Sequence, residues 1–472
     1  MKKYILALVI AAGSLSVMSC EDQLSALPDQ KKVVGNVIVD QKTAEVALNG
    51  VYYRFVNAAL DRDAESTKLG YVNEILPALA AGHVNYPYGG AIDLEENYRV
   101  TAGSHTVTGI WSYSYQLVNA ANGVLEQIEG VADSKFTGNR KQEIIAEARF
   151  LRAYGNYKLL CWYAEFFDEE SPYGIMIREE FVTTNNLAGT RSNVKDSYKF
   201  ILDDLEFAIT NMPDANPNHY ANKSVGKGLK ARVLIMRGHQ ADYQEVITLT
   251  NEVIGSGIYQ LEGNVQDIFT TKALSSKEIM LGAFPYVDQI NHHDTYFSEY
   301  YGTSYLPSLK FQALLEGDPR EDWLVGFLSG SYGEGMAVKK YYGEKVEYSY
   351  PMRLTEMYLL NAEAVIRSGG DLGLAKARIK EVLSHAGFTD FSHVDDIADR
   401  NELLYFLYEE WVRSMAFEDC HDWFALIRLP YEKIKEIKPE VQHENFRILP
   451  VPAAEFQKNP AFGDQNPGYS KN

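Results

Sequence analysis

The sequence predicts a mostly α-helical protein that is built on tetratricopeptide-like pairs of helices and has a second, irregular half rich in loops. Apolar residues recur at helical spacing in several long segments. Two of these segments are helical hairpins that resemble each other. Residues 256–350, between the hairpins, lose the helical periodicity and are rich in Gly, Tyr and Ser. With 472 residues, of which 46% are hydrophobic, the chain can bury a large core.

Residues 1–19 have the pattern of a secretory signal peptide. Two lysines give a positive start, and the apolar run that follows, residues 5–17, is shorter than the roughly 20 residues of a membrane span. The segment ends at Cys20 like a lipobox, and the chain then turns acidic and polar. We therefore expect Cys20 to become an acylated, palmitate-bearing N-terminus followed by a tether over residues 20–42. The alternative is an ordinary signal peptide in which the cysteine is incidental.

Helices are predicted wherever the helical spacing of apolar residues continues. The first begins near Thr43, whose hydroxyl can cap it, and the strongest covers 139–167. A long loop rich in Gly and Tyr is predicted over 81–103, and four prolines keep 448–469 extended or turning. The other predicted helices cover 109–130, 194–211, 224–237, 243–255, 354–367, 374–386 and 400–417.

The two hairpins are predicted at 224–255 and 354–386. When they are offset by 129 residues, Val246 aligns with Ala375 and Val253 aligns with Val382. Helical hairpins that recur and pack side by side form a solenoid of the tetratricopeptide kind.

The acidic composition excludes some classes of partner. The net charge of −19, which becomes −21 once Lys2 and Lys3 leave with the signal, repels phosphate backbones and anionic lipid. We therefore expect no nucleic-acid partner, and we expect lipid contact only at the N-terminus. Cys161 and Cys420 are far apart in apolar, helical surroundings, which favours two buried free thiols over a disulfide.

Four blocks in order along the chain, together with the lipobox, resemble the SusD/RagB family of lipid-anchored nutrient-binding proteins. They lie at 146–160 (AEARFLRAYGNYKLL), 225–261, 353–370 (RLTEMYLLNAEAVIRSGG) and 448–469. One departure is EDCHDWFAL, which stands where the family has EGHRWFDL, with one extra residue and Ala425 in place of the usual Asp.

The resemblance implies a SusD-like fold and a function. Residues 43–472 would form one domain, with helical-repeat parts at about 43–80, 109–255 and 353–417 and irregular parts at about 256–350 and 430–472. The protein would sit on the outer membrane, exposed at the cell surface, and act as a lid on a SusC-like TonB-dependent transporter. It would deliver an oligosaccharide, with no cofactor and no enzymatic reaction. The alternatives are a peptide-binding import subunit, a helical-repeat scaffold without a small ligand, or an enzyme that consumes its ligand.

Tyrosines are the candidate ligand-binding residues, because the chain has 32 Tyr against 21 Phe and 5 Trp. An aromatic face can stack on a sugar ring while polar neighbours bind its hydroxyls. The alternative for each tyrosine is a place in the core, as we expect for Trp323 after DPRED. The candidates are Tyr86 and Tyr88 in the loop at 81–103, Tyr296, Tyr300 and Tyr301 with the neighbouring Tyr305, and Tyr332.

Two polar clusters resemble metal sites only superficially. The run at 292–294, His-His-Asp, has no partner at ligand spacing and is interpreted as a polar loop. The run at 418–422, Glu-Asp-Cys-His-Asp, lacks the spaced ligand pairs of a zinc site and is interpreted as structural. No metal site is predicted.

Overall fold

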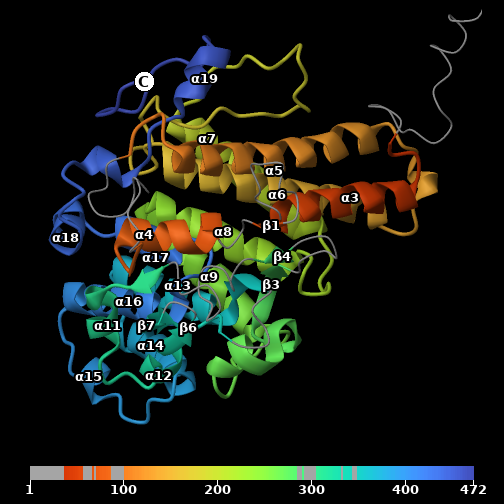
Figure 1. Cartoon of the computed structure of the whole chain (residues 1–472). Helices are drawn as coiled ribbons and strands as arrows, with labels where there is room; N and C mark the ends of the chain where they lie inside the picture. The colour runs from red at the N-terminus through yellow and green to blue at the C-terminus, as the bar shows by residue number, and fades with distance from the viewer. Residues whose placement is uncertain are drawn as a thin grey trace, which may run out of the picture.

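The computed structural model describes residues 37–56, 66–67, 71–86, 100–283, 290–291, 305–330, 333–342 and 348–472 (Figure 1). Long helices dominate it, and the strands are short. The helices are α3 (Gln41–Val56), α4 (Leu76–Ala81), α5 (His105–Glu129), α6 (Arg140–Tyr163), α7 (Val194–Asn211), α8 (Lys223–Arg237), α9 (Gln240–Gly255), α11 (Leu309–Leu315), α12 (Glu321–Leu324), α13 (Leu354–Arg367), α14 (Leu372–His385), α15 (Ser392–Asp395), α16 (Arg400–Met415), α17 (His421–Ile427), α18 (Tyr431–Ile437) and α19 (Ala453–Lys458). The strands are β1 (Ser66–Thr67), β2 (Val84–Asn85), β3 (Ile279–Ala283), β4 (Ile290–Asn291), β5 (Leu306–Pro307), β6 (Val325–Gly330), β7 (Gly333–Val338) and β8 (Ser349–Arg353).

The long helices pack as a series of antiparallel neighbours. Helices α5, α6, α7, α8 and α9 each contact the next one along the chain, and α9 then packs on α13, which packs on α14 and α16. The two predicted hairpins, α8–α9 and α13–α14, therefore lie side by side, and the aligned residues Val246, Ala375, Val253 and Val382 are all buried. The prediction of a tetratricopeptide-like arrangement of helical pairs is confirmed.

Most predicted helices are confirmed with bounds that shift by a few residues, and α7 has the predicted bounds. The prediction that Thr43 is the residue that caps the first helix, α3, is wrong, because Thr43 lies inside the helix. The helix begins at Gln41, and Asp40 precedes it, with its carboxylate accepting from the Thr43 N–H at 2.9 Å. The Thr43 hydroxyl in turn accepts from the Asp40 N–H at 3.0 Å, so Thr43 is the inner partner of a capping box.

The C-terminal segment is only partly as predicted. It contains a short helix, α19, where an extended or turning chain is expected. Pro452 occupies the position before the first helical residue, and Pro460 follows the end of the helix. Proline is tolerated at both places, because it removes no intrahelical hydrogen bond there, so the prolines bracket the helix and do not prevent it.

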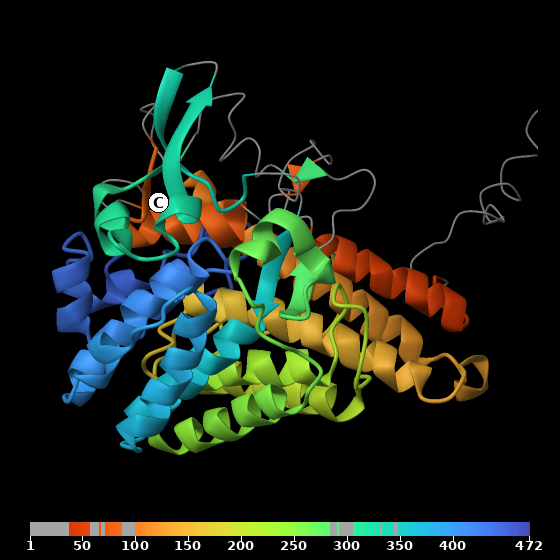
Figure 2. The same ribbon diagram turned by 90° about the horizontal axis from the view of Figure 1, so that it is seen from below.

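The strands form four two-stranded pairs among the described residues, and each pair includes at least one strand from residues 256–350. They are β1–β4, which is parallel, and β2–β5, β3–β8 and β6–β7, which are antiparallel. Figure 2 shows the β6–β7 hairpin projecting from one side of the molecule and the α8–α9 and α13–α14 pairs on the opposite side. The predicted loss of long helices between the hairpins is thus confirmed for the part of 256–350 that the structure describes, which holds short strands and short helices.

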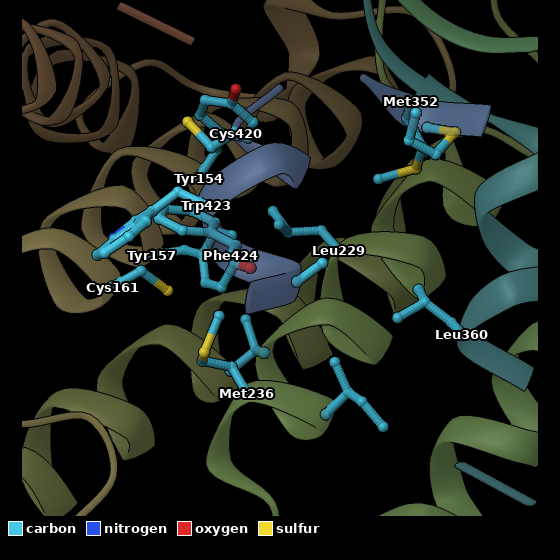
Figure 3. Packing of buried hydrophobic residues seen from close by; sticks show 14 of the residues in the cluster. Tyr154, Tyr157, Cys161, Leu229, Met236, Met352, Leu360, Cys420, Trp423 and Phe424 are labelled. Atoms are coloured by element: carbon cyan, nitrogen blue, oxygen red, sulfur yellow. The ribbon is translucent and has the colours of Figure 1, made fainter. Parts of the chain in front are cut away.

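The hydrophobic core joins three elements that are distant in sequence. In Figure 3 the side chains of Tyr157 and Cys161 from α6 lie beside Trp423 and Phe424 from α17, with Leu229 of α8 on the other side. The rings of Tyr157 and Phe424 meet edge to face, with centroids 5.9 Å apart. Both predicted thiols, Cys161 and Cys420, are buried and free, as expected.

An ionic cluster lies next to this core, at residues 418–422. Glu418 accepts from Arg353 at 2.6 Å and from Lys340 at 2.5 Å, and all three side chains are completely buried. Asp419 accepts from Lys158 of α6 at 2.9 Å. We call residues 418–422 and their cationic partners the central ion cluster.

Further partners of the central ion cluster come from α8, α13 and the segment after α4. Arg232 of α8 donates both to Asp419 and to Glu356 of α13. Asp422 lies 2.6 Å from the Nδ1 atom of His83 and also accepts from the Phe417 N–H at 2.7 Å. These pairs within the protein confirm the structural interpretation of the run at 418–422.

The backbone of this segment is strained, because residues other than glycine have positive φ values, which the sequence does not predict. Phe417, Asp419 and Cys420 have φ values of 62°, 40° and 71°, although none of them is glycine. Such conformations cost free energy and persist only where surrounding contacts impose them. Here the contacts are the ion pairs, together with the hydrogen bond from the Cys420 N–H to the Asn73 carbonyl at 2.6 Å.

The close approach of α5 and α6 depends on Gly155. A Cβ atom at this position would lie 2.9 Å from Val118 Cγ2 and 3.1 Å from the Ser114 carbonyl oxygen, both on α5. We expect Gly155→Val to lower the free energy of unfolding by about 2 kcal/mol, because the helices must separate. Urea unfolding measures the change. The matched control is Gly50→Val in α3, where a Cβ would contact nothing within 4 Å. Equal stability of the two variants would contradict the prediction.

Glu363 of α13 predicts a dependence of stability on pH. Burial alone would raise the pKa of this carboxyl, but Arg428 and Arg367, which donate to it at 2.7 and 2.9 Å, lower the pKa to about 2. The pair therefore stabilises the fold above the ordinary pKa of about 4.3, and its contribution is lost as the pH falls toward 2.

We expect Glu363→Gln to reduce the free energy of unfolding by about 3 kcal/mol at pH 7. The difference from the parent protein should shrink between pH 4.5 and 2, roughly, because the parent carboxyl becomes protonated there. Urea unfolding at pH 7 and at pH 3 measures both differences. Glu381→Gln on the exposed side of α14 is the control and should change neither. A difference that is the same at both pH values would contradict the assignment.

Candidate functional site

The β2–β5 pair brings together two parts of the chain that are far apart in sequence. Val84 pairs with Pro307, and Asn85 pairs with Leu306. The Ser308 N–H also donates to the His83 carbonyl at 2.8 Å, which extends the contact by one residue. The chain leaves β2 toward residues 87–99 and enters β5 from residues 292–304. The two segments in which the sequence places its main tyrosine candidates are therefore attached to the same point of the fold.

Tyr86 and Tyr305 meet at this point. Their ring centroids lie 5.5 Å apart, at an interplanar angle of 42°. Tyr305 is buried, whereas Tyr86 is half-buried and packs against the core. Tyr305 is therefore a core residue, which was the alternative to ligand binding, and Tyr86 lies at the border between the core and the surface.

The other predicted ligand-binding residues lie outside the described residues. They are Tyr88, Tyr296, Tyr300, Tyr301 and Tyr332, and the lipidation residue Cys20 and the polar run at 292–294 also lie outside them.

The β6–β7 hairpin adjoins the same point. Its strands pair from Val325 with Val338 to Gly330 with Gly333, and β7 contacts β5. Residues 331–332, which include the predicted Tyr332, connect the two strands. We use the name strand face for the surface formed by β2, β5 and the β6–β7 hairpin.

Sequence reasoning missed an exposed aromatic residue on the strand face. Phe327 of β6 is 72% exposed, which is unusual for a phenylalanine. The alternation of apolar and small residues in VGFLSG could have indicated a strand with one face open to solvent. Trp323 differs, because it is half-buried and its ring stacks on Phe269 with centroids 5.7 Å apart, as expected for a structural residue.

The buried titratable groups of the central ion cluster are bound to other side chains of the protein, so they have structural roles. Burial raises the pKa of the Cys420 thiol to about 12, so this cysteine is not a thiolate nucleophile at neutral pH. Among the described residues, no group of three or more His, Cys, Asp or Glu side chains has the arrangement of a metal site. Within the same ranges, no helix combines the length and the apolar character needed to cross a bilayer.

Two family models match the chain. A model described as "Starch-binding associating with outer membrane" matches residues 83–235, and a model described as "SusD family" matches residues 335–447. The first match includes β2 and α5 to α7, and the second includes α13 to α18. Both therefore cover the helical scaffold that supports the strand face.

Curated relatives and solved structures agree with these matches. A SusD-like protein of Bacteroides ovatus is 24% identical over 284 residues, which are 58% of this chain and 48% of that protein, so the match spans about half of that relative. SusD-like protein P2 of Formosa agariphila is 21% identical over 440 residues, 79% of this chain and 83% of that protein.

Among solved structures, a SusD superfamily protein of Bacteroides thetaiotaomicron has a TM-score of 0.75 at 19% identity, covering 91% of this chain and 100% of its own. A laminarin-binding SusD-like protein has a TM-score of 0.72 at 19% identity, covering 92% of this chain and 100% of its own. The order of helices, the packed helical pairs and these matches lead to one conclusion: the chain is a member of the SusD/RagB family, whose members associate with the outer membrane.

Proposed function

We propose that the protein is a lipid-anchored protein of the cell surface that binds an oligosaccharide at the strand face and delivers it to a SusC-like TonB-dependent transporter. Family membership supports a binding role, since one family model describes starch binding and one structural neighbour binds laminarin. The single observation that supports this location is the junction of β2 with β5, to which both tyrosine-bearing segments are joined along the chain.

The chemistry of the strand face suits a sugar. A sugar ring offers patches of C–H groups that stack on aromatic rings, and hydroxyl groups that need polar partners. Tyr86 and Phe327 supply aromatic surface, and the exposed Asn85 supplies an amide next to it. Tyr305 supports Tyr86 from the core side.

The proposed delivery step depends on the anchor at Cys20. A random-coil chain of about 20 residues has a root-mean-square end-to-end distance of roughly 25 Å. Such a tether holds a lid close to its transporter while the lid opens and closes. The helical pairs lie on the side opposite the β6–β7 hairpin (Figure 2).

The combined variant Tyr296→Ala, Tyr300→Ala and Tyr301→Ala tests the ligand site. We expect it to weaken oligosaccharide binding at least roughly tenfold, because each stacked ring contributes about 1 kcal/mol. Calorimetric titration measures the affinity, and the melting temperature should stay near that of the parent protein. Tyr405→Ala in α16 is the control for losing a tyrosine elsewhere.

Unchanged affinity in the combined variant would exclude this site. Stabilisation by peptide pools and not by glycan pools would exclude a glycan as the ligand, and the appearance of shortened products would indicate an enzyme.

Phe327→Ala tests the part of the strand face that the sequence did not reveal. Because the ring is 72% exposed, its removal should leave the melting temperature unchanged. We expect oligosaccharide affinity to fall roughly fivefold, equivalent to about 1 kcal/mol. Leu374→Ala is the matched control, since this side chain is 61% exposed on α14, in the helical scaffold. An equal effect of both substitutions would show that Phe327 has no special role.

A further inference from the structure

A pocket of 240 Å³ lies directly beside β2. It is open to solvent and is lined by the end of α4, the beginning of α11 and the end of α18, which lie on the same side of the molecule (Figure 1). The residues that determine its chemistry are Gly82, Asn85, Lys310, Ile437, Lys438 and Glu440. All of them are described by the structure, and Asn85 is the residue before Tyr86.

Lys438 is the unusual member of this set. It is only 5% exposed, yet its ammonium group makes no hydrogen bond within the described part of the chain. Its nearest carboxylate oxygen is Glu440 Oε2 at 3.7 Å, too far for a hydrogen bond, and this oxygen is itself buried without a hydrogen-bond partner. The stem of the lysine is therefore buried, and its ammonium borders the pocket, where its N–H groups can donate to an acceptor that enters.

The surroundings of Lys438 leave room for an acceptor. Gly82 ends α4 in the left-handed conformation, with φ of 78°, and a Cβ atom there would approach the Lys438 ammonium to 3.3 Å. The glycine thus permits the helix end and the lysine to approach each other closely. The pocket volume is several times the roughly 30 Å³ that one water occupies in the liquid. It can therefore hold a group larger than a single water.

A second lysine faces the same pocket. The Lys310 ammonium donates to the Ile437 carbonyl at 2.5 Å, at the C-terminal end of α18. Burial and the positive charge of Lys438 lower the pKa of Lys310, and burial lowers the pKa of Lys438. Two ammonium groups and one carboxylate, that of Glu440, leave the pocket with one positive charge in excess. One bound anionic group would balance this charge and supply the missing acceptors.

We propose that this pocket binds the acidic substituent of a sugar residue, a uronate carboxylate or a sulfate ester, within the glycan held at the strand face. The inference rests on the proposed function, because it names the class of glycan for the same site. Asn85 connects the two regions, since it lines the pocket, pairs with Leu306 in the strand face and precedes Tyr86. A sugar that stacks at Tyr86 would place its neighbour's acidic group at Lys438.

The first experiment uses three sugars that differ only at C6: glucose, glucuronate and glucose 6-sulfate. The full-length protein carries ¹³C at the lysine ε-carbons, and the Lys438 signal is identified by its loss in Lys438→Met. We expect glucuronate or glucose 6-sulfate, or both, to shift the Lys438 signal saturably, while glucose does not. The two acidic sugars separate a carboxylate site from a sulfate site. If neither acidic sugar moves the signal, or if glucose moves it equally, the proposal is wrong.

The second experiment compares oligosaccharides in charged and neutral pairs, such as an oligogalacturonate and its methyl ester, and a sulfated galactan fragment and its desulfated form. We expect the parent protein to bind a charged member at least roughly tenfold more tightly than its neutral counterpart. Lys438→Met and Lys310→Met should remove this preference without changing the affinity for the neutral member. Lys433→Met is the control, because this lysine of α18 pairs with Glu436 outside the pocket.

The outcomes separate the two proposals. Equal affinity for charged and neutral members would overturn the acidic-sugar inference and leave glycan binding in place. If no oligosaccharide binds while the acidic monosaccharides still shift the Lys438 signal, the glycan-delivery function fails and the anion pocket stands.

The stability of unliganded Lys438→Met provides a further readout. If Lys438 makes a structural contact, replacing it should give a less stable protein. If Lys438 serves a ligand, the melting temperature should equal or exceed that of the parent, because the methionine retains the packing of the stem and removes a charge whose nearest carboxylate oxygen is 3.7 Å away. A clear fall in melting temperature, with no loss of charged-sugar binding, would assign Lys438 to the scaffold.

Discussion

The central ion cluster is the constraint on which the rest of the structure depends. Residues 418–422 are held in place by four cations from other parts of the chain that bind their carboxylates, namely Lys158, Arg232, Lys340 and Arg353. Removing charges from water is costly, and the cost is recovered only when all partners are in place. The cluster therefore favours the correctly assembled fold over misfolded arrangements, because a misplaced helix would leave a buried charge without its partner.

The same cluster positions the candidate site. His83, which binds Asp422, is one residue before β2, and Lys340, which binds Glu418, is two residues after β7. Both residues lie next to the ends of strands that form the strand face. The site thus consists of surface segments whose ends are fixed by buried charges, while the helical pairs on the opposite side supply the frame.

The helices could be predicted from the sequence because helical periodicity is a local signal, and α7 illustrates this with its predicted bounds. The central ion cluster could not be predicted, since its partners are distant. Asp422 and His83 are 339 positions apart, and only the fold shows that they meet. The β2–β5 pair involves two residues on each strand, too few for an alternation pattern to be recognised. Lys310 and Lys438 are ordinary lysines in the sequence, and their shared pocket arises from three elements that meet in space.

An acidic protein can recognise an acidic sugar only through cations that act at short range. With a net charge of −19, the surface as a whole repels anions, and salt screens exposed charges beyond about 8 Å. A lysine on the open surface would therefore add little selectivity. A lysine that is 5% exposed and makes no hydrogen bond to the described residues is screened less by salt, and it interacts more strongly with a group that enters the pocket. The burial of Lys438 is thus the property that would let an acidic lid select an acidic ligand, and an exposed lysine at the same place would not replace it.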